Sequence, residues 1–345
     1  MKISINATCF TNEPSGAKNR FIGIYGHLFK RFPENKFFVF EPQDCSVSDW
    51  FLPLPNVQFI PTDLSGRDSV WRYLKGLLVW ERELKRIDSD IFETFTLPLV
   101  KSPVGRTILT IHDIRYIRHP EFYSKTREVI SPVILNRALS EADHVITVSY
   151  AMKEELLKFC PNADISVVYN GVDAEAYRTL SSEKLLRVKN RYNLREDFLL
   201  SIGHFEKRKN YPCLLKAIKL LKNGGDNFFL VIVGNEADDT ETVCKEIKDM
   251  DLSNNVLLLK NLADQEIRCL YRLCSLFVYP SLYEGFGIPI LEAMKCGCPV
   301  ILSNGGSIKE IGGPGLEYFD PFCSENIKEN MENVLLSDEK QRQII

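Results

Sequence analysis

The sequence predicts an α/β protein built from two domains, each with a doubly wound parallel sheet. The 345 residues exceed what one hydrophobic core usually organises, so two domains of roughly 150–200 residues are expected. Short runs of β-branched, aromatic and aliphatic residues alternate with helical patterns along the chain. Each run is bounded by Gly, Pro or polar residues, as is typical of strands buried inside a parallel sheet.

The expected strands fall into two groups. In the first half they are 2–5, 37–40, 57–60, 91–94, 107–111, 144–148 and 165–169. In the second half they are 198–202, 228–233, 256–259, 276–279, 300–302 and 316–319. A polar, charged stretch separates the two groups. We therefore expect an N-terminal domain over 1–172, a linker region over 173–195 and a C-terminal domain over 196–345.

Composition excludes several classes of protein. The 45% of hydrophobic and 26% of charged residues are typical of globular proteins. A net charge of −3 provides no overall attraction to nucleic acid, so no nucleic-acid partner is expected. The ten Cys include no CxxC pair, which indicates reduced packing residues rather than a zinc site or disulfides. The N-terminus has no signal-peptide core and no apolar run reaches the ~20 residues of a membrane span, so we expect a cytoplasmic protein.

The strongest functional signal lies in residues 280–294, where a strand ends, a glycine loop turns and a helix begins. Gly285 and Gly287 let the backbone approach a ligand closely, and the N–H groups at the start of the helix favour a phosphate. Glu284 in the loop and Glu292 in the helix would bring two carboxylates to one pocket, where they accept hydrogen bonds from sugar hydroxyls. The alternative is that one is a turn residue and the other a solvated helix residue.

A second segment, 200–210, also combines a strand, a glycine turn and a helix start, and it is rich in cations. Gly203 follows the strand, and Arg208 and Lys209 are suited to neutralise a diphosphate that leaves during a transfer reaction. No metal-binding DxD-like pattern stands out, so no metal is expected. Taken alone, this basic run could also be solvated surface.

Both segments resemble the signatures of the retaining glycosyltransferases of family 4. The likeness runs through EGFGIPILEAMKCGCPV at 284–300 and through the pattern G-x-x-E-x-R-K-N at 203–210. It implies the GT-B fold, two Rossmann-like domains facing a cleft that holds the site. It also implies that Glu292 holds the ribose hydroxyls of the nucleotide and that Glu284 holds a hydroxyl of the donor sugar.

By the same resemblance, the backbone of Phe286, Gly287 and Ile288 would contact the donor sugar and its diphosphate. His204 departs from the pattern, because many relatives have Arg directly after the glycine. The phosphate site would then depend more heavily on Arg208, and His204 is given no role.

Two segments of the first half resemble the family less closely. HDIRYIRHP at 112–120 places His112 at a strand exit, which implies contact with the donor sugar or the reaction centre; a structural histidine is the alternative. Asp113 is expected to support His112 or to cap a helix. Gly16 lies in a segment similar to the family's short glycine loop, which approaches the diphosphate or the acceptor, although a lone Gly often marks only a turn.

The resemblance implies a metal-independent hexosyltransferase that acts with retention and needs no cofactor. The donor would be a GDP- or UDP-linked sugar, with mannose as one candidate. The acceptor would be a saccharide or a lipid-linked molecule in cell-surface polysaccharide or lipopolysaccharide synthesis. A related epimerase and a nucleotide-sugar-binding protein without transfer activity stay open as alternatives. A dehydrogenase is disfavoured, because neither glycine turn continues as G-x-G-x-x-G.

Residues 67–86 form an apolar and basic pattern that includes Trp71, Leu74, Leu77, Leu78 and Leu84. A helix packed against the N-terminal sheet explains them. The alternative is a basic-aromatic face in peripheral contact with an anionic membrane at the inner side of the plasma membrane. At the other end, relatives usually continue beyond the position of Ile345 with helices that cross back to the first domain, and these final crossover helices are not recognisable here.

Overall fold

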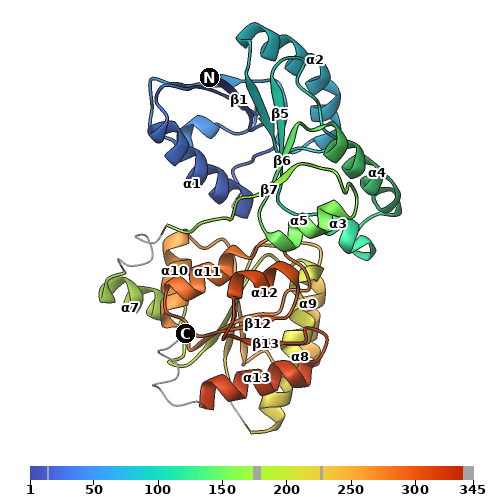
Figure 1. Ribbon diagram of the computed structural model, residues 1–345. Helices are drawn as coiled ribbons and strands as arrows, with labels where there is room; N and C mark the ends of the chain where they lie inside the picture. Colours follow the sequence, from blue (N-terminus) through green and yellow to red (C-terminus); the bar gives the residue numbers. More distant parts are fainter. Residues whose placement is uncertain (14, 174–179, 226–227, 337–345) are drawn as a thin grey trace. The chain divides into compact units, whose positions relative to one another are not determined.

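The computed structural model describes residues 1–13, 15–173, 180–225 and 228–336. It divides the chain into two compact units, Met1–Gly171 and Val172–Ile345 (Figure 1). Each unit is a parallel sheet with helices packed on both of its faces, which confirms the predicted α/β class. The chain end at 338–345 and residues 174–179 of the expected linker lie outside the described residues.

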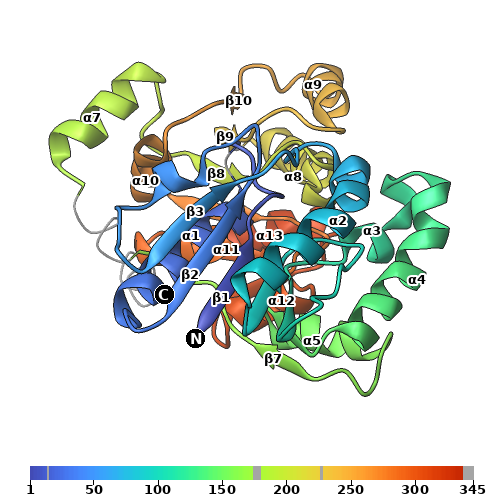
Figure 2. The ribbon, with the colours of Figure 1, turned by 90° about the horizontal axis from the view of Figure 1, so that it is seen from above.

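The first unit holds a seven-stranded sheet in the order β3-β2-β1-β4-β5-β6-β7, in which all neighbouring strands are parallel. Its strands are β1 Lys2–Asn6, β2 Lys36–Glu41, β3 Val57–Pro61, β4 Ile91–Thr94, β5 Arg106–Ile111, β6 His144–Thr147 and β7 Ile165–Val167. Its helices are α1 Gly16–Arg31, α2 Ser69–Ile87, α3 Arg115–Arg118, α4 Lys125–Glu141 and α5 Tyr150–Leu157, with 3₁₀ turns η1 Val47–Trp50 and η2 Pro120–Phe122. Figure 2 shows β1, β2 and β3 side by side.

Strand periodicity explains how this sheet is covered, because successive side chains point to opposite faces. Val39 of β2 packs on one face in a cluster with Phe21 of α1. Its neighbour Phe40 packs on the other face with Trp80 and Leu84 of α2, and the rings of Phe40 and Trp80 are 5.1 Å apart. Accordingly, α1 lies on one side of the sheet in Figure 1, and α2 and α4 lie on the other.

The second unit holds a six-stranded parallel sheet in the order β10-β9-β8-β11-β12-β13. Its strands are β8 Leu199–Ile202, β9 Leu230–Val233, β10 Val256–Leu259, β11 Leu276–Tyr279, β12 Val300–Ser303 and β13 Glu317–Phe319. Its helices are α7 Ser182–Arg191, α8 Tyr211–Asn223, α9 Thr240–Asp249, α10 Asp264–Leu273, α11 Ile288–Lys295, α12 Gly306–Gly312 and α13 Ser324–Leu336, with the 3₁₀ turn η3 Lys207–Lys209.

Two cores sandwich the second sheet. Leu230 and Ile232 of β9 face the core beneath α8, α9 and α13. Val231 and Val233 face the core beneath α10 and α11. All four side chains are at most 4% exposed, as expected of a strand that is covered on both faces.

The region expected as a linker belongs in part to the second unit. α7 begins after Ser181, whose side chain caps the helix by accepting from the backbone N–H of Lys184 at 3.4 Å. Val188 is buried in the core of the second unit, and Tyr192 donates to Glu266 of α10 at 2.9 Å. The charged residues occupy the exposed side of the helix, so the composition of this stretch concealed its few apolar contacts.

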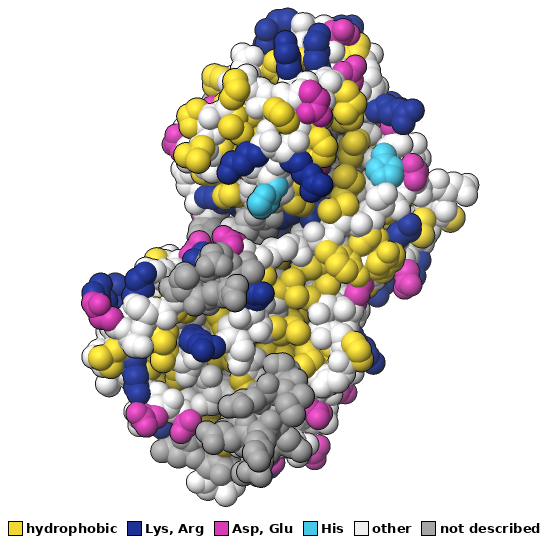
Figure 3. Space-filling view, turned by 60° about the vertical axis from the view of Figure 1, so that its left-hand side comes forward, with side chains coloured by type: hydrophobic (Ala, Val, Ile, Leu, Met, Phe, Trp, Pro, Cys, Tyr) yellow, Lys and Arg dark blue, Asp and Glu magenta, His cyan; other side chains and the backbone are white. Residues whose placement is uncertain are grey.

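The expected packing of 67–86 is right for one side of α2 and wrong for the other. Gly76, Trp80, Leu84 and Ile87 are buried at helical spacing against the sheet. The other apolar side chains point into solvent; the exposed fractions are 61% for Trp71, 48% for Leu74, 44% for Leu77 and 76% for Leu78. On the face of the molecule that Figure 3 shows, Lys and Arg side chains are mixed with Asp and Glu side chains over the surface.

Candidate functional site

The predicted donor-site segments follow two adjacent strands of the second sheet. The strand order reverses between β8 and β11, because β9 and β10 lie on one side of this pair and β12 and β13 on the other. Doubly wound sheets bind ligands at the carboxyl ends of strands at such a switch point. The turn at Gly203 follows β8, and the loop that contains Glu284 follows β11.

The loop after β11 is held by hydrogen bonds from neighbouring elements. Ser307 Oγ donates to the backbone oxygen of Glu284 at 2.6 Å, and Ser303 Oγ donates to that of Ser281 at 2.6 Å. Phe286 is 5% exposed and anchors the loop to the interior. Gly287 has φ +104°, and a Cβ there would lie 2.8 Å from Cδ1 of Ile290. Glycine is therefore required for the loop to enter α11, which begins at Ile288.

Arg208, Lys209 and Glu284 form a buried cluster of charges at this edge. Lys209 Nζ lies 2.6 Å from Oε1 of Glu284, and Arg208 Nη1 lies 2.7 Å from Oε2. Tyr279, the last residue of β11, donates to Oε1 at 2.8 Å. Arg208 Nε also donates to Glu206 at 2.5 Å. The side chains of Lys209, Glu284 and Arg208 are 8%, 11% and 13% exposed.

The ionisation of this cluster follows from its geometry. Burial opposes the charge of Glu284, but Arg208 and Lys209 outweigh it and hold the pKa of this carboxyl well below its usual range. Burial lowers the pKa of Lys209, against the opposing attraction of Glu284. Burial and then Glu284 raise the pKa of Tyr279 well above its usual value, so its hydroxyl stays a donor. Glu284 is thus a carboxylate at any physiological pH.

The turn after β8 brings Lys209 into this position. A Cβ on Gly203 would lie 2.7 Å from Cε of Lys209, so the glycine leaves room for the lysine side chain. Asn210 donates its amide to the backbone oxygens of Pro280 at 3.2 Å and Pro321 at 2.7 Å, which ties the basic turn to the glutamate loop. His204 has a structural contact, because its Nδ1 accepts from the backbone N–H of Asn235 at 3.2 Å.

Glu292 lies in the second turn of α11 and is partly buried. Tyr271 of α10 donates to its Oε2 at 3.0 Å. A row of rings connects this residue with the charge cluster: Tyr271 lies 5.3 Å from Phe277, and Phe277 lies 5.7 Å from Tyr279. The two carboxylates predicted from the sequence are therefore each held by a tyrosine of the same row, named here the aromatic row.

The other two predicted residues belong to the first unit. Gly16 is the first residue of α1, directly after Ser15, whose hydroxyl caps the helix by accepting from Lys18 N at 3.2 Å. His112 follows β5 and stacks on Phe95 with ring centroids 6.2 Å apart. Burial, reinforced by Arg20, lowers the pKa of His112 to about 4, so the imidazole is neutral at pH 7.

The Nε2 atom of His112 is buried and has no hydrogen-bond partner among the described residues. Because unsatisfied buried polar atoms are rare, such an atom is expected to meet a ligand or a water. Asp113 accepts from the backbone N–H of Arg115 at 3.3 Å just before α3, but the N-cap residue of this helix is Ile114.

Sequence reasoning missed the tyrosines and a second buried network. Neither Tyr271 nor Tyr279 was given a role in the predicted site, although Tyr279 directly precedes the loop and its position at a strand exit was a usable signal. In the first unit, Thr110 donates to Glu93 at 2.7 Å. Burial raises the pKa of this carboxyl, against hydrogen bonds from Tyr25 and Thr110. No motif marks Glu93.

Two searches of the described part of the chain were negative. Residues 1–13, 15–173, 180–225 and 228–336 contain no group of three or more His, Cys, Asp or Glu arranged to hold a metal ion. None of the helices described in these ranges combines the length and hydropathy that a transmembrane span requires.

Comparison with known proteins gives two family matches and several related mannosyltransferases. Residues 42–176 match the model of Glycosyltransferase Family 4, and residues 182–345 match that of Glycosyl transferases group 1. The O-antigen chain mannosyltransferase B of Escherichia coli is 31% identical over 236 residues, which are 68% of this chain and 62% of the relative. The serotype-specific mannosyltransferase WbdA of Escherichia coli is 29% identical over 264 residues, 73% of this chain but 32% of the relative. The chain thus spans less than two thirds of the length of each.

Solved structures share the fold. Anabaena HepE, crystallised with UDP and glucose, superposes with a TM-score of 0.73 over 99% of this chain and 91% of that chain, at 20% identity. Sucrose-phosphate synthase from Thermosynechococcus elongatus gives a TM-score of 0.78 over 99% and 91%, at 17% identity. Both units contain a parallel sheet, and the signature residues of the second unit lie together at its switch point. Two family models together span most of the sequence. The chain therefore belongs to the family 4 glycosyltransferases of GT-B fold.

Proposed function

We propose that the chain transfers a hexose, mannose first among the candidates, from a GDP- or UDP-linked donor to a saccharide or lipid-linked acceptor during synthesis of cell-surface polysaccharide or lipopolysaccharide. The observation that carries the proposal is the buried carboxylate of Glu284 between Lys209 and Arg208 at the switch point of the second sheet. The names of the two Escherichia coli mannosyltransferases support the choice of mannose and of O-antigen-like products.

The second unit would bind the donor. The backbone N–H groups at Phe286, Gly287 and Ile288, at the start of α11, would face the diphosphate. The fixed cations Arg208 and Lys209 would stabilise the charge that develops on the leaving nucleoside diphosphate, so the transfer would need neither a metal ion nor another cofactor. Because these cations are already oriented by Glu284, little reorganisation accompanies bond cleavage.

Glu284 would orient the sugar rather than attack it. A carboxylate offers about four lone-pair positions, and Lys209, Tyr279 and Arg208 already occupy three. The remaining position suits one hydroxyl of the donor sugar. A carboxylate whose pKa is held far below its usual range by two cations is a poor nucleophile. This supports retention without a covalent intermediate on Glu284, and we assign no side chain as general base.

Glu292 would accept from the ribose hydroxyls of the nucleotide, with Tyr271 fixing its orientation. His112 in the first unit would offer its neutral Nε2 to a hydroxyl of the sugar. Gly16 would let the start of α1 approach the diphosphate or the acceptor.

Thermal-shift measurements test the donor site directly. The protein is mixed with GDP, UDP, dTDP and CMP and with the corresponding sugar nucleotides. GDP or UDP should raise the Tm, and Glu292→Ala should remove most of the shift. Glu241→Ala, an exposed glutamate on α9, is the matched control and should keep it. If no nucleotide stabilises the protein, the donor-site assignment is wrong.

Product analysis then tests the reaction. With GDP-mannose or a UDP-hexose and a panel of saccharide acceptors, NMR of the product should show the anomeric configuration of the donor retained, and EDTA should not reduce the rate. An inverted product, a free sugar epimer or complete loss of activity in EDTA would each overturn the corresponding part of the proposal.

We also propose that the first unit makes peripheral contact with an anionic membrane, at the inner face of the plasma membrane of its cell. The supporting surface, called the α2–α4 apolar face, consists of exposed Val70, Leu74, Leu77 and Leu78 on α2 and Val129, Ile130 and Val133 on α4. Both helices lie on the same side of the first sheet (Figure 1). Cations outnumber acidic residues on α2 by five to two, which favours anionic headgroups.

Vesicle flotation tests this contact. The protein should float with vesicles that contain phosphatidylglycerol and much less with pure phosphatidylcholine. Leu77→Ala with Leu78→Ala should lower the partition coefficient about tenfold, because each leucine loses part of the ~1.5–3 kcal/mol gained when it leaves water. Leu186→Ala, which truncates an exposed leucine on α7, should have no effect. Equal flotation of all three proteins would refute the proposed face.

A further inference from the structure

A pocket of about 370 Å³ opens in the first unit, and none of its lining residues is assigned to the donor site above. It lies beyond the carboxyl ends of β2 and β3 and beside the first two turns of α2. Its lining is Gln43, Asp63, Leu64, Ser65, Asp68, Trp71, Arg72 and Lys75. Its volume falls within the range of roughly 300–1,000 Å³ that small-molecule sites occupy.

One wall of the pocket is rigid. Arg72 Nη1 donates to the backbone oxygens of Ser65 at 3.0 Å and Gly66 at 2.7 Å. Asp44 accepts from the Ser65 hydroxyl and from the Gly66 backbone N–H, both at 2.8 Å. A Cβ on Gly66 would lie 2.4 Å from the backbone oxygen of Phe10, so the loop packs against the segment that follows β1 and leaves no space for a side chain at this position. A site held in this way does not have to be ordered by its ligand.

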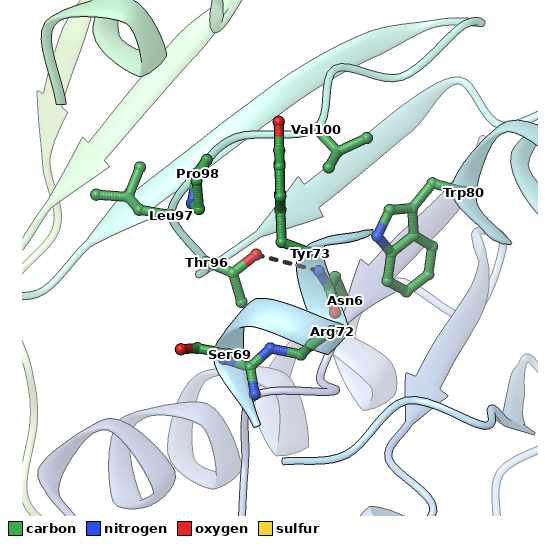
Figure 4. A pocket seen from close by; sticks show the side chains of 9 residues that line it. All are labelled: Asn6, Ser69, Arg72, Tyr73, Trp80, Thr96, Leu97, Pro98 and Val100. Carbon is green, nitrogen blue, oxygen red and sulfur yellow. Dashed lines mark hydrogen bonds between the residues drawn. The ribbon is translucent and has the colours of Figure 1, made fainter. Parts of the chain in front are cut away.

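A much smaller cavity continues inward from Arg72. It is lined by Asn6, Ser69, Tyr73, Thr96 and other residues shown in Figure 4, and its volume of about 10 Å³ holds a single water at most. Asn6 ends β1 and donates to Thr94 at the end of β4 at 3.0 Å. The strand order of the first sheet reverses between β1 and β4. The small cavity therefore lies at the switch point of the first sheet, where such sheets bind ligands, and it shares Arg72 with the larger pocket.

The chemistry of the lining is that of a polar, uncharged ligand. Asp63 and Asp68 are balanced by Arg72 and Lys75, and Lys75 lies 3.5 Å from Asp63. The two carboxylates disfavour a phosphate or another anion, and the two cations disfavour a metal ion. With anions and metal ions disfavoured, the hydrogen-bonding groups of the lining suit a ligand that carries hydroxyl groups.

Trp71 adds a flat apolar surface to these groups. It is 61% exposed at the mouth of the pocket, whereas Trp80 on the buried side of the same helix is 2% exposed. Asp68 uses Oδ1 to cap α2 through the backbone N–H of Trp71 at 3.0 Å. Within the described part of the chain, its Oδ2 and the side-chain amide of Gln43 make no hydrogen bond. An aromatic platform beside exposed carboxylate and amide groups that are not engaged by the protein fits a pyranose ring, which has apolar C–H faces and a rim of hydroxyls.

We propose that this pocket is a binding site for a neutral hexose unit of the acceptor chain, with Trp71 beneath the ring and Gln43, Asp63 and Asp68 on its hydroxyls. The inference rests on the proposed function, since the acceptor of that reaction is a saccharide. It gives the first unit a site for the growing chain that is separate from the donor residues of the second unit.

Tryptophan fluorescence and calorimetry test the site without any donor. Neutral trisaccharides of mannose, glucose, galactose and N-acetylglucosamine are titrated into the full chain. At least one should bind and change the emission of Trp71. Trp71→Ala should weaken binding about tenfold, which corresponds to ~1.4 kcal/mol. Trp71→Tyr, which keeps an aromatic ring, should recover part of the affinity, and Asp63→Asn should weaken it several-fold. Leu52→Ala, at another exposed apolar residue of the same unit, is the control and should bind as the wild type does.

The outcomes separate this inference from the proposed function. In the transfer assay, Trp71→Ala should raise the KM for the acceptor with little change in kcat, and GDP or UDP should stabilise the variant as they do the wild type. If transfer occurs but neither binding nor KM depends on Trp71, the pocket assignment fails alone. If no nucleotide binds but a trisaccharide binds through Trp71, the donor assignment fails and the saccharide site stands. If none of the trisaccharides binds, the inference is overturned.

Discussion

Replacing Glu284 by Gln tests the central claim about the second unit, that a buried carboxylate holds two cations in place. The substitution keeps the shape of the side chain but removes its charge. Arg208 keeps its contact with Glu206, whereas Lys209, whose side chain is 8% exposed, loses its carboxylate partner. Removing one partner of a buried pair typically costs about 3–5 kcal/mol, because it leaves an uncompensated charge. With an m-value of ~3 kcal/mol/M, as expected for a unit of this size, the urea midpoint should fall by about 1–2 M.

The assay can report each unit separately. Trp50, Trp71 and Trp80 are the three tryptophans of the chain, and all belong to the first unit. Tryptophan fluorescence therefore follows unfolding of the first unit, and far-UV circular dichroism follows both. Glu284→Gln should lower the urea midpoint of the second unit, which circular dichroism detects, and should leave the fluorescence midpoint of the first unit unchanged.

A matched control and a double-mutant cycle complete the test. Glu236 and Lys260 are also 2.6 Å apart, but Glu236 is 71% exposed. Glu236→Gln should leave the midpoint unchanged, because exposed pairs contribute little. Adding Lys209→Met to Glu284→Gln should restore part of the lost stability, with a coupling energy of about 1–3 kcal/mol. Strict additivity of the two substitutions, or an unchanged midpoint in Glu284→Gln, would refute the argument.

Three further predictions follow from the geometry. The pKa of His112 is about 4 in the folded state against an ordinary 6.5. Between these pH values the unfolded state therefore binds a proton on His112 that the folded state does not bind. The free energy of unfolding of the first unit should fall by up to ~3 kcal/mol as the pH drops through this window. Urea titrations followed by fluorescence at pH 4.5 and 7 should show this loss reduced in His112→Gln, and an equal loss in both proteins would contradict it. Arg208→Ala should weaken GDP or UDP at least tenfold by calorimetry but leave the parent nucleoside unaffected, since the guanidinium is assigned to the diphosphate; equal weakening of both would be inconsistent with that role. Gly287→Ala should destabilise the second unit by about 1–3 kcal/mol because of its φ of +104°. Gly23→Ala, in open space within α1, should instead stabilise the first unit by about 0.5–1 kcal/mol. Urea denaturation followed by fluorescence and circular dichroism measures both changes in the free energy of unfolding, and changes of the same sign would contradict this prediction.

The strands were predictable because each is a short apolar run that ends at a Gly, Pro or polar residue. Expected and observed ends differ by two residues at most; 228–233, for example, is observed as Leu230–Val233. The helix over 67–86 was equally predictable, but its packing was not. Periodicity identifies an apolar stripe, and α2 has one on each side, of which only that containing Trp80 and Leu84 meets the sheet.

The charges of the candidate site show a second limit. The motifs identified Arg208, Lys209 and Glu284 separately and assigned the cations to a diphosphate and the carboxylate to a sugar. The ion pairs among them join residues about 75 positions apart in the sequence, and only the pairing of β8 with β11 brings these segments together. Glu93 had no signal at all, because its burial beside Tyr25 depends on the packing of α1 against the sheet.

The aromatic row has a further consequence for selectivity. Tyr279 and Tyr271 hold Glu284 and Glu292 from the two ends of the aromatic row, whose three rings are buried. The aromatic row therefore fixes the distance between Glu284, proposed to bind the hexose, and Glu292, proposed to bind the ribose. Only a donor whose linker has the right length can reach both ends at once. A sugar joined to its nucleoside through a single phosphate would reach only one of the two carboxylates, so the protein would select for the diphosphate through its own core as well as through phosphate contacts.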